Sequence, residues 1–319
     1  MHECFRMKLS ILIALIAAAD TGAMHLAAAD FQTGLDAYQR GDYATAIAAW
    51  TPYAERGDAN AEYNLGLLYA NGKGVPKDMT KAIEWYRKAA DQGVAAAEYN
   101  LGVIYAKGDG VPVDRAESAK WFTQAAQRGI GRAMNNLGRV YTEGPEATHN
   151  HPEAEKWYRD AAEKGIASAA FDLGLMYDLG HGVEQSFDEA LKWYQKAAEA
   201  GNPDAQFVLG QKYEDGEGVQ QSYEVAAKWF RKAAEHVPDL GGAGHGRYHL
   251  GQLYLEGLGV PRDYVQAYFW LTLFGPDAAA DAKAHLSAAQ VQEADELVRK
   301  WKTQHRVSPE VEAASRIPN

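Results

Sequence analysis

The chain has 319 residues, and its 32 Lys and Arg residues against 43 Asp and Glu residues leave a formal net charge of −11 at pH 7. So acidic a chain is a poor partner for nucleic acid or for an anionic membrane surface. Its one cysteine excludes a disulfide within the chain, and its length alone would allow two domains.

Residues 1–29 have the plan of a secretory signal peptide. A short basic segment precedes the apolar run Leu9–Ala19, which is too short to span a bilayer and matches the apolar core of such a peptide. Two Ala-Ala-Ala-Asp strings follow, and we expect cleavage after Ala29, with Ala19 as the alternative. The sequence therefore predicts export to a bacterial periplasm, or else secretion, and no membrane span in the cleaved chain.

Residues 30–59 predict a first pair of helices. The stretch "GLDAYQRGDYATAIAAW" at 34–50 places Tyr38 and Trp50 12 residues apart. The same two residue types stand 16 apart, at Tyr69 and Trp85, in the unit that follows. The first pair therefore has a shorter turn between its helices.

From residue 60 to about residue 275 the sequence repeats with a period of 36 residues, and one last step of 41. A Leu-Gly pair recurs, followed by Tyr four residues after the leucine and by Trp twenty residues after it. The leucines of these pairs are Leu65, Leu101, Leu137, Leu173, Leu209 and Leu250. A period between about 20 and 50 residues is the signature of a solenoid built from stacked repeats.

Each repeat predicts two helices joined by a glycine turn. Ala61, Leu65 and Tyr69 lie on one face of the first helix, and Ala82 and Trp85 begin the apolar face of the second. Most turns read Gly-x-Gly-Val and end at a residue that suits a helix N-cap, namely Asp78, Asp114, Asn150, Ser186, Ser222 and Asp263. Glu117, Glu153, Glu189 and Gln266 stand three residues later and predict capping boxes.

Two segments interrupt the pattern. The third turn, "TEGPEATHNHPE", lacks Gly-x-Gly-Val. The segment 235–246 contains Pro238 and four glycines, which predicts a break or a kink.

With these columns of residues in place, residues 60–275 resemble a Sel1-like repeat protein of the exported bacterial type, a relative of the tetratricopeptide repeats. Residues 30–59 resemble one tetratricopeptide unit. The resemblance implies an all-α fold, an α/α superhelical solenoid of about six repeats with a concave surface for protein–protein contacts. It implies no catalytic residues.

The period fades beyond the last repeat. Residues 276–302 predict a terminal capping element, in which Ser287 and Gln290 form a capping box and Ala294 and Val298 face the preceding repeat. Residues 303–319 are polar, contain two prolines, and predict a disordered tail.

The surface with binding potential follows from helix geometry. If Ala61, Leu65 and Tyr69 face inward, the positions of residues 60, 63, 67 and 71 lie on the opposite side of the first helix. In tetratricopeptide-like arrays that side lines the concave groove. The partner-binding candidates on and beside it are Tyr63, Asn64, Leu67, Tyr99, Asn100, Val103, Asn135, Arg139, Phe171, Phe207, Gln211 and Tyr248. The asparagines either bind a peptide backbone or bridge neighbouring helices.

Other chemistry is weaker in the sequence. His149 and His151 could ligate a metal, but they lie in the irregular turn. His245 and His249 occupy repeat positions that hold asparagine in other repeats. Sequence variation between repeats therefore explains this pair better than a functional site does. We therefore expect no catalytic, cofactor-binding or metal-binding residue, and no cofactor.

The function expected from the sequence is a non-catalytic scaffold in the cell envelope that binds a protein or peptide partner in the concave groove. The alternative is an envelope enzyme, or a direct activator of an enzyme acting on peptidoglycan or exopolysaccharide.

Overall fold

The structure, a computed structural model, describes residues 31–143, 150–236 and 241–305. The predicted signal peptide, residues 144–149 of the irregular third turn, Pro238 and the tail from residue 306 lie outside the described residues. Within the described ranges every regular element is a helix, as the sequence predicts. The chain divides between residues 149 and 150 into two compact units. Unit N denotes residues 31–143, and unit C denotes residues 150–305.

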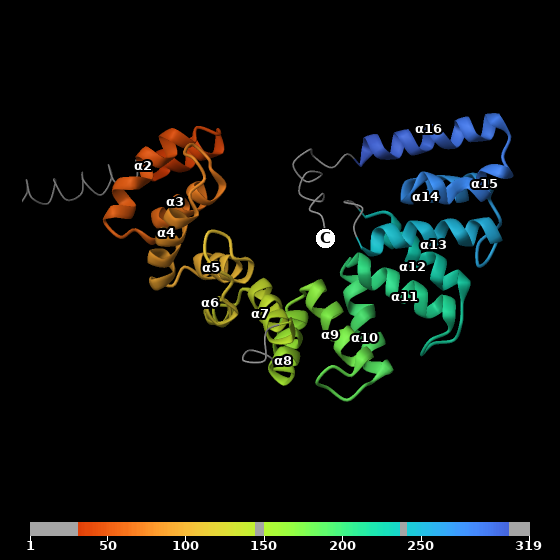
Figure 1. Cartoon of the computed structure of the whole chain (residues 1–319), viewed down its shortest axis with the longest axis horizontal. Coiled ribbons are helices and arrows are strands. Elements are labelled where there is room, and N and C mark those ends of the chain that lie inside the picture. Colours follow the sequence, from red (N-terminus) through yellow and green to blue (C-terminus); the bar gives the residue numbers. More distant parts are fainter. Residues whose placement is uncertain (1–30, 144–149, 237–240, 306–319) are drawn as a thin grey trace, which may run out of the picture. The chain divides into compact units, whose positions relative to one another are not determined.

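Unit N holds the first helix pair, the first two repeats and half of the third (Figure 1). Residues 31–39 are helical. The helices that follow are α2 (Tyr43–Glu55), α3 (Ala59–Asn71), α4 (Met79–Asp91), α5 (Ala95–Lys107), α6 (Arg115–Gln127) and α7 (Gly131–Glu143).

Unit C holds the remaining repeats and the terminal helices. They are α8 (His151–Glu163), α9 (Ala167–Leu179), α10 (Phe187–Glu199), α11 (Pro203–Asp215), α12 (Tyr223–Ala234), α13 (Gly242–Glu256), α14 (Tyr264–Phe274), the 3₁₀ turn η1 (Pro276–Ala279), α15 (Ala280–Ala284) and α16 (Ala288–Gln304). In both units, helices that follow one another in the chain pack together. The first helices of the repeats are α3, α5, α7, α9, α11 and α13, and the second helices are α4, α6, α8, α10, α12 and α14.

The glycine of the Leu-Gly pair lets the second helix lie directly on the first. A Cβ added at Gly102 would lie 2.5 Å from Cδ1 of Phe122, and one at Gly210 would lie 2.4 Å from Cε1 of Phe230. Both rings are fully buried and have no room to move away. The same close approach recurs at Gly66, Gly174 and Gly251. The repeated motif is therefore a packing requirement, because any larger residue would force the two helices apart.

The turn between the helices uses two glycines and one capping side chain. Gly108 and Gly110 have φ values of +74° and +78°, a conformation that glycine adopts without strain. Asp114 then accepts a hydrogen bond of 2.9 Å from the backbone N–H of Glu117. Every one of the six predicted N-cap residues caps its helix in this way.

None of the four capping boxes predicted in these turns, at Glu117, Glu153, Glu189 and Gln266, forms in the described residues. The three glutamates have other partners. Each carboxylate pairs with a lysine three residues further along, at 3.1 Å for Glu117 and Lys120 and at 3.3 Å for Glu189 and Lys192. Glu153 pairs with a lysine in the same way. A cation one turn ahead on the helix surface competes with the neutral amide of the N-cap residue.

The tryptophan column is less uniform than the sequence predicts. Three of its members are buried, with exposed fractions of 5–7%: Trp121, Trp193 and Trp270. The other three, Trp85, Trp157 and Trp229, are half-buried, and the ammonium group of Lys88 lies 4.1 Å from the ring centroid of Trp85. The position that is buried throughout is the next one, held by Tyr86, Phe122, Tyr158, Tyr194, Phe230 and Leu271.

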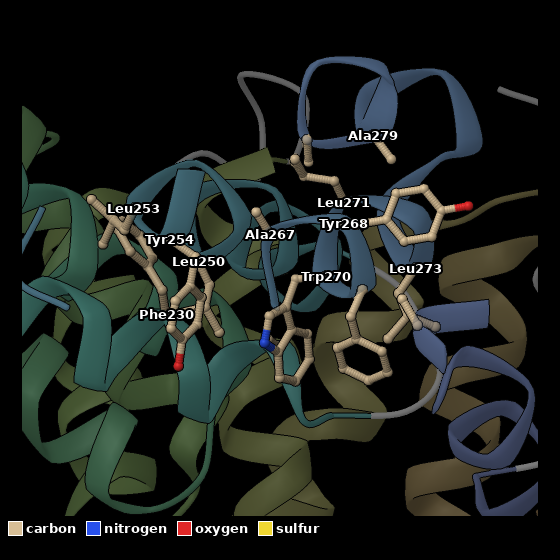
Figure 2. Close-up of a cluster of buried hydrophobic side chains, with 14 of the residues drawn as sticks. Phe230, Leu250, Leu253, Tyr254, Ala267, Tyr268, Trp270, Leu271, Leu273 and Ala279 are labelled. Carbon is tan, nitrogen blue, oxygen red and sulfur yellow. The ribbon is translucent and has the colours of Figure 1, made fainter. Parts of the chain in front are cut away.

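The terminal helix α16 closes the apolar core of unit C, as predicted. Ser287 and Gln290 form a complete capping box at its start. Ala294 and Val298 are buried in the same cluster as Trp270, which lies on α14. Figure 2 shows this cluster, to which α13 contributes Leu250 and Leu253 and α14 contributes Trp270 and Leu271. The last repeat therefore does not expose its apolar face to water.

The break predicted at 235–246 is shorter than the sequence suggests. Residues 242–246 belong to α13, and the backbone N–H of Gly242 donates to Asp204 at 2.6 Å. A Cβ added at Gly246 would lie 2.8 Å from the Cβ of Ala233. The glycines thus bring α13 close to α11 and α12 instead of interrupting the helix.

Candidate functional site

The candidate site is the surface that the first helices turn away from the core, here called the first-helix face. It comprises the slots of residues 60, 63, 67 and 71 in every repeat. The slot of residue 63 forms an aromatic row along the repeats. Four rings of this row contribute to the packing of the fold, because each contacts the second helix of its own repeat. The ring centroids lie 5.7–6.0 Å apart in the pairs Tyr63–Tyr86, Tyr99–Phe122, Phe171–Tyr194 and Phe207–Phe230.

The two remaining members of this row differ from each other. Asn135 is buried, with an exposed fraction of 8%. Tyr248 is 36% exposed, and its ring centroid lies 5.2 Å from that of Phe274. Of the predicted row, Tyr248 therefore presents the most open aromatic surface.

The predicted amides bridge neighbouring repeats. The side chain of Asn136 donates to the hydroxyl of Tyr99 in the preceding repeat at 3.4 Å. Asn100 makes the corresponding bond to Tyr63, which partly offsets the rise that burial causes in the pKa of this phenol. Asn64 is half-buried. The structure thus gives a bond between neighbouring repeats for Asn100 and Asn136, and binding of a partner by these amides stays a prediction.

The slot of residue 67 forms a second row along the repeats, in which one member of each unit is exposed, Arg139 in unit N and Leu175 in unit C. Leu67 and Val103 are half-buried, and Leu67 packs against the core of unit N. Gln211 is also half-buried. Leu175 is 39% exposed, and Leu179, one turn further along α9, is 52% exposed. Leu175 and Leu179 therefore place two exposed apolar side chains one turn apart on α9.

Unit N carries a small pocket between α5, α6 and α7, here called the α5–α7 pocket. Its volume is about 210 Å³. Val103, Ala106, Phe122, Val140 and the amide of Asn136 line it, together with Lys107, Arg115, Arg139 and Glu143. Two of the predicted candidates, Val103 and Arg139, are thus brought together at one depression.

A charged cluster beneath the first-helix face of unit C is missing from the sequence prediction. Lys212 is 6% exposed, and its ammonium group lies 3.1 Å from the carboxylate of Asp178. The hydroxyl of Tyr194 donates to the same carboxylate at 3.1 Å. Burial, and then the charge of Asp178, raise the pKa of this phenol. The signal was present in the sequence, because Lys212 stands in a slot held by apolar residues such as Leu68 and Ile104.

The histidines act as packing residues. Nδ1 of His249 donates a hydrogen bond of 2.8 Å to the carboxylate of Glu214, and its ring stacks on Phe230 with the ring centroids 4.9 Å apart. His245 stacks on Phe207 at 5.1 Å. His151 lies near His181, with ring centroids 6.3 Å apart, and His149 lies outside the described residues.

Two further searches cover only residues 31–143, 150–236 and 241–305. In these ranges no group of three or more His, Cys, Asp and Glu residues could hold a metal ion. In the same ranges, no helix combines the length and the apolar character that crossing a membrane requires.

Paired helices, a Leu-Gly contact in each pair and a capped glycine turn define a helical-repeat solenoid. The model of the Sel1 repeat matches six segments, namely 59–94, 95–130, 131–166, 167–202, 203–236 and 244–274. The chain belongs to the Sel1 repeat family. Proteins of this family generally act as scaffolds for protein–protein interaction.

Several solved structures are similar to this chain, among them two Sel1-type proteins of known source. A Sel1 repeat protein from Oxalobacter formigenes is 32% identical, with a TM-score of 0.65, and the match covers 77% of this chain and 96% of that one. The protein c5321, described as a protective antigen of uropathogenic Escherichia coli, is 29% identical, with a TM-score of 0.51. That match covers 91% of this chain and 71% of c5321.

A curated relative matches over a shorter stretch. The DAP3-binding cell death enhancer 1 of Mus musculus is 40% identical over 50 residues, which is 16% of this chain. This chain spans only about 10% of the length of that relative.

Proposed function

We propose that this protein is a non-catalytic scaffold of the bacterial cell envelope and that it binds a protein or peptide partner along its first-helix face. Support for the envelope comes from the apolar run Leu9–Ala19 behind a basic segment, which is typical of an export signal. Support for a protein partner comes from the Sel1 repeats themselves.

One observation carries the choice of surface. Six large apolar side chains among the described residues of unit C are at least 36% exposed, and three of them, Leu175, Leu179 and Tyr248, occupy slots of the first-helix face. The other three, Phe187, Phe274 and Leu297, lie singly on α10, α14 and α16. The outer side of the second helix α10 instead presents charged groups such as Lys192 and Lys196. Apolar and aromatic side chains at the centre of a patch with a polar rim are typical of protein interfaces.

The test is affinity capture with two matched variants. Leu179→Glu adds one negative charge on the first-helix face, and Gln195→Glu adds one on the outer side of α10. The tagged proteins are purified after crosslinking in the cells that produce them, and the partners are quantified by mass spectrometry.

We expect a partner that falls at least tenfold with Leu179→Glu and stays unchanged with Gln195→Glu. Because both positions are exposed, both variants should keep their stability within about 0.5 kcal/mol. A partner that is lost only with Gln195→Glu would place recognition on the opposite side of the solenoid and contradict the proposal.

A further inference from the structure

We propose that the α5–α7 pocket binds the last residue of a partner polypeptide, with the apolar side chain of that residue on the pocket floor and its terminal carboxylate at the cationic rim. The inference rests on the proposed function, since it names the chemical form of a partner on the first-helix face of unit N. Figure 1 shows the three helices concerned, α5, α6 and α7.

The floor of the pocket is apolar. Val103 and Ala106 come from α5, Phe122 from α6 and Val140 from α7. The ring of Phe122 is held in place by Gly102 and by Tyr99, whose ring centroid lies 5.8 Å away. A floor fixed in this way can receive an apolar side chain without rearranging.

The rim of the pocket is cationic, although the chain as a whole carries a net charge of −11. Lys107, Arg115 and Arg139 line it against a single carboxylate, Glu143, so its formal charge is +2. Arg139 pairs with Glu143 at 3.0 Å. Among the described residues no carboxylate pairs with Lys107 or Arg115. These two cations are available to a carboxylate from outside the chain.

The volume of the pocket indicates that the carboxylate belongs to a small group, such as a single amino-acid residue. At about 210 Å³ it is smaller than the ~300–1,000 Å³ of pockets that hold drug-sized ligands or cofactors. It suits a single amino-acid residue. A residue inside a polypeptide carries either an apolar side chain or a carboxylate. An apolar residue at the C-terminus carries both, and both are bonded directly to its Cα. Only the latter satisfies the floor and the rim together.

The experiment uses the full-length protein and pools of fluorescein-labelled octapeptides. Seven degenerate positions are followed by a fixed last residue in three forms: leucine with a free carboxylate, leucine amide, and lysine with a free carboxylate. The pools are selected on immobilised protein, and the peptides recovered are measured singly by fluorescence anisotropy.

We expect selection from the leucine acid pool, and a loss of at least about tenfold in affinity when the same peptide is amidated, the size typical of a charge-assisted hydrogen bond. Arg115→Gln should cause a similar loss. This variant should fold, because it removes a cation from the first position of α6, where the helix dipole disfavours positive charge. Arg115→Lys should restore part of the binding, and Arg132→Gln, an exposed change on α7 outside the pocket, should leave it unchanged.

The inference is overturned if no leucine acid peptide is recovered, if the acid and amide forms bind equally, or if Arg115→Gln binds as the unaltered protein does. Peptides recovered for an internal acidic residue, with no preference at the last position, also overturn it. None of these results touches the proposed function, which fails only if captured partners are indifferent to substitutions such as Leu179→Glu.

Discussion

The close approach at Gly102 makes a prediction about the repeated Leu-Gly motif. In an ordinary helix interior, Gly→Ala stabilises by about 1 kcal/mol because alanine has the higher helix propensity. At Gly102 the new methyl group would lie 2.5 Å from Cδ1 and 2.6 Å from Cε1 of Phe122. Phe122 is 1% exposed, and Ser118 fastens the same contact by donating to the carbonyl of Gly102 at 2.8 Å. Overpacking of a core that cannot yield costs about 1–3 kcal/mol or more, so Gly102→Ala should be destabilising by about 1–2 kcal/mol net.

A double-mutant cycle tests whether the clash with the ring of Phe122 causes the loss of stability. Phe122→Ala removes the ring, at a cost of about 3–5 kcal/mol for a buried phenylalanine. In that background Gly102→Ala should become stabilising, because the clash is gone and propensity alone remains. Urea unfolding followed by far-UV circular dichroism measures each step, and hydrogen exchange in α5 and α6 localises it. If Gly102→Ala costs the same with and without the Phe122 ring, the packing explanation of the Leu-Gly motif is wrong.

Three further predictions follow from the charged groups and the N-terminus. Burial raises the pKa of Glu62 above its ordinary value of 4.5, so the charged carboxylate lowers the stability of the fold at neutral pH. Glu62→Gln should therefore raise the midpoint of urea unfolding at pH 7. This gain should disappear as the pH falls below 4.5, because the carboxyl group is then protonated in the folded and in the unfolded chain. A midpoint difference that grows on acidification would contradict this sign. Lys212→Met should cost about 3 kcal/mol because it leaves the half-buried carboxylate of Asp178 without its cation, and adding Asp178→Ala should recover most of the loss. A double variant as unstable as the single one would refute the pairing. N-terminal sequencing of the protein from its native cells should begin at Asp30, and a chain that retains residues 1–29 would contradict export.

Most of the fold could be predicted because one physical pattern is repeated six times. The N-caps were predictable from residue type alone, since Asp, Asn and Ser share the ability to accept a bond from an orphan backbone amide. The capping boxes at the glutamates were not predictable in the same way, because Lys120 and its equivalents offer a competing charge that the four-residue signature ignores. The half-buried tryptophans were missed because a column of identical letters does not reveal how far the neighbouring helices cover each ring. A lysine lies over the half-buried Trp85 and over the buried Trp121 alike.

The candidate site was predictable as a face of a helix but not in its detail. Helix periodicity predicted slots that face away from the core, and Tyr248 lies exposed in one of them, whereas Asn135 is buried in another. It could not show that Tyr63 and Phe171 rest on the second-helix rings Tyr86 and Tyr194, because that contact depends on how closely the glycines allow the helices to approach. The α5–α7 pocket could not be predicted from the sequence for a similar reason. Its lining comes from three helices spread over 41 positions of the chain, from residue 103 to residue 143.

Site-specific photo-crosslinking tests the central claim, recognition by the first-helix face, most directly. A benzophenone side chain is placed singly at Leu175, Leu179 and Tyr248, and as controls at Lys192 and Lys228 on the second helices, all of them exposed positions. On irradiation in intact cells, the first three positions should give discrete adducts that share one partner, and the two lysine positions should give none. Adducts confined to the two lysine positions would contradict the account.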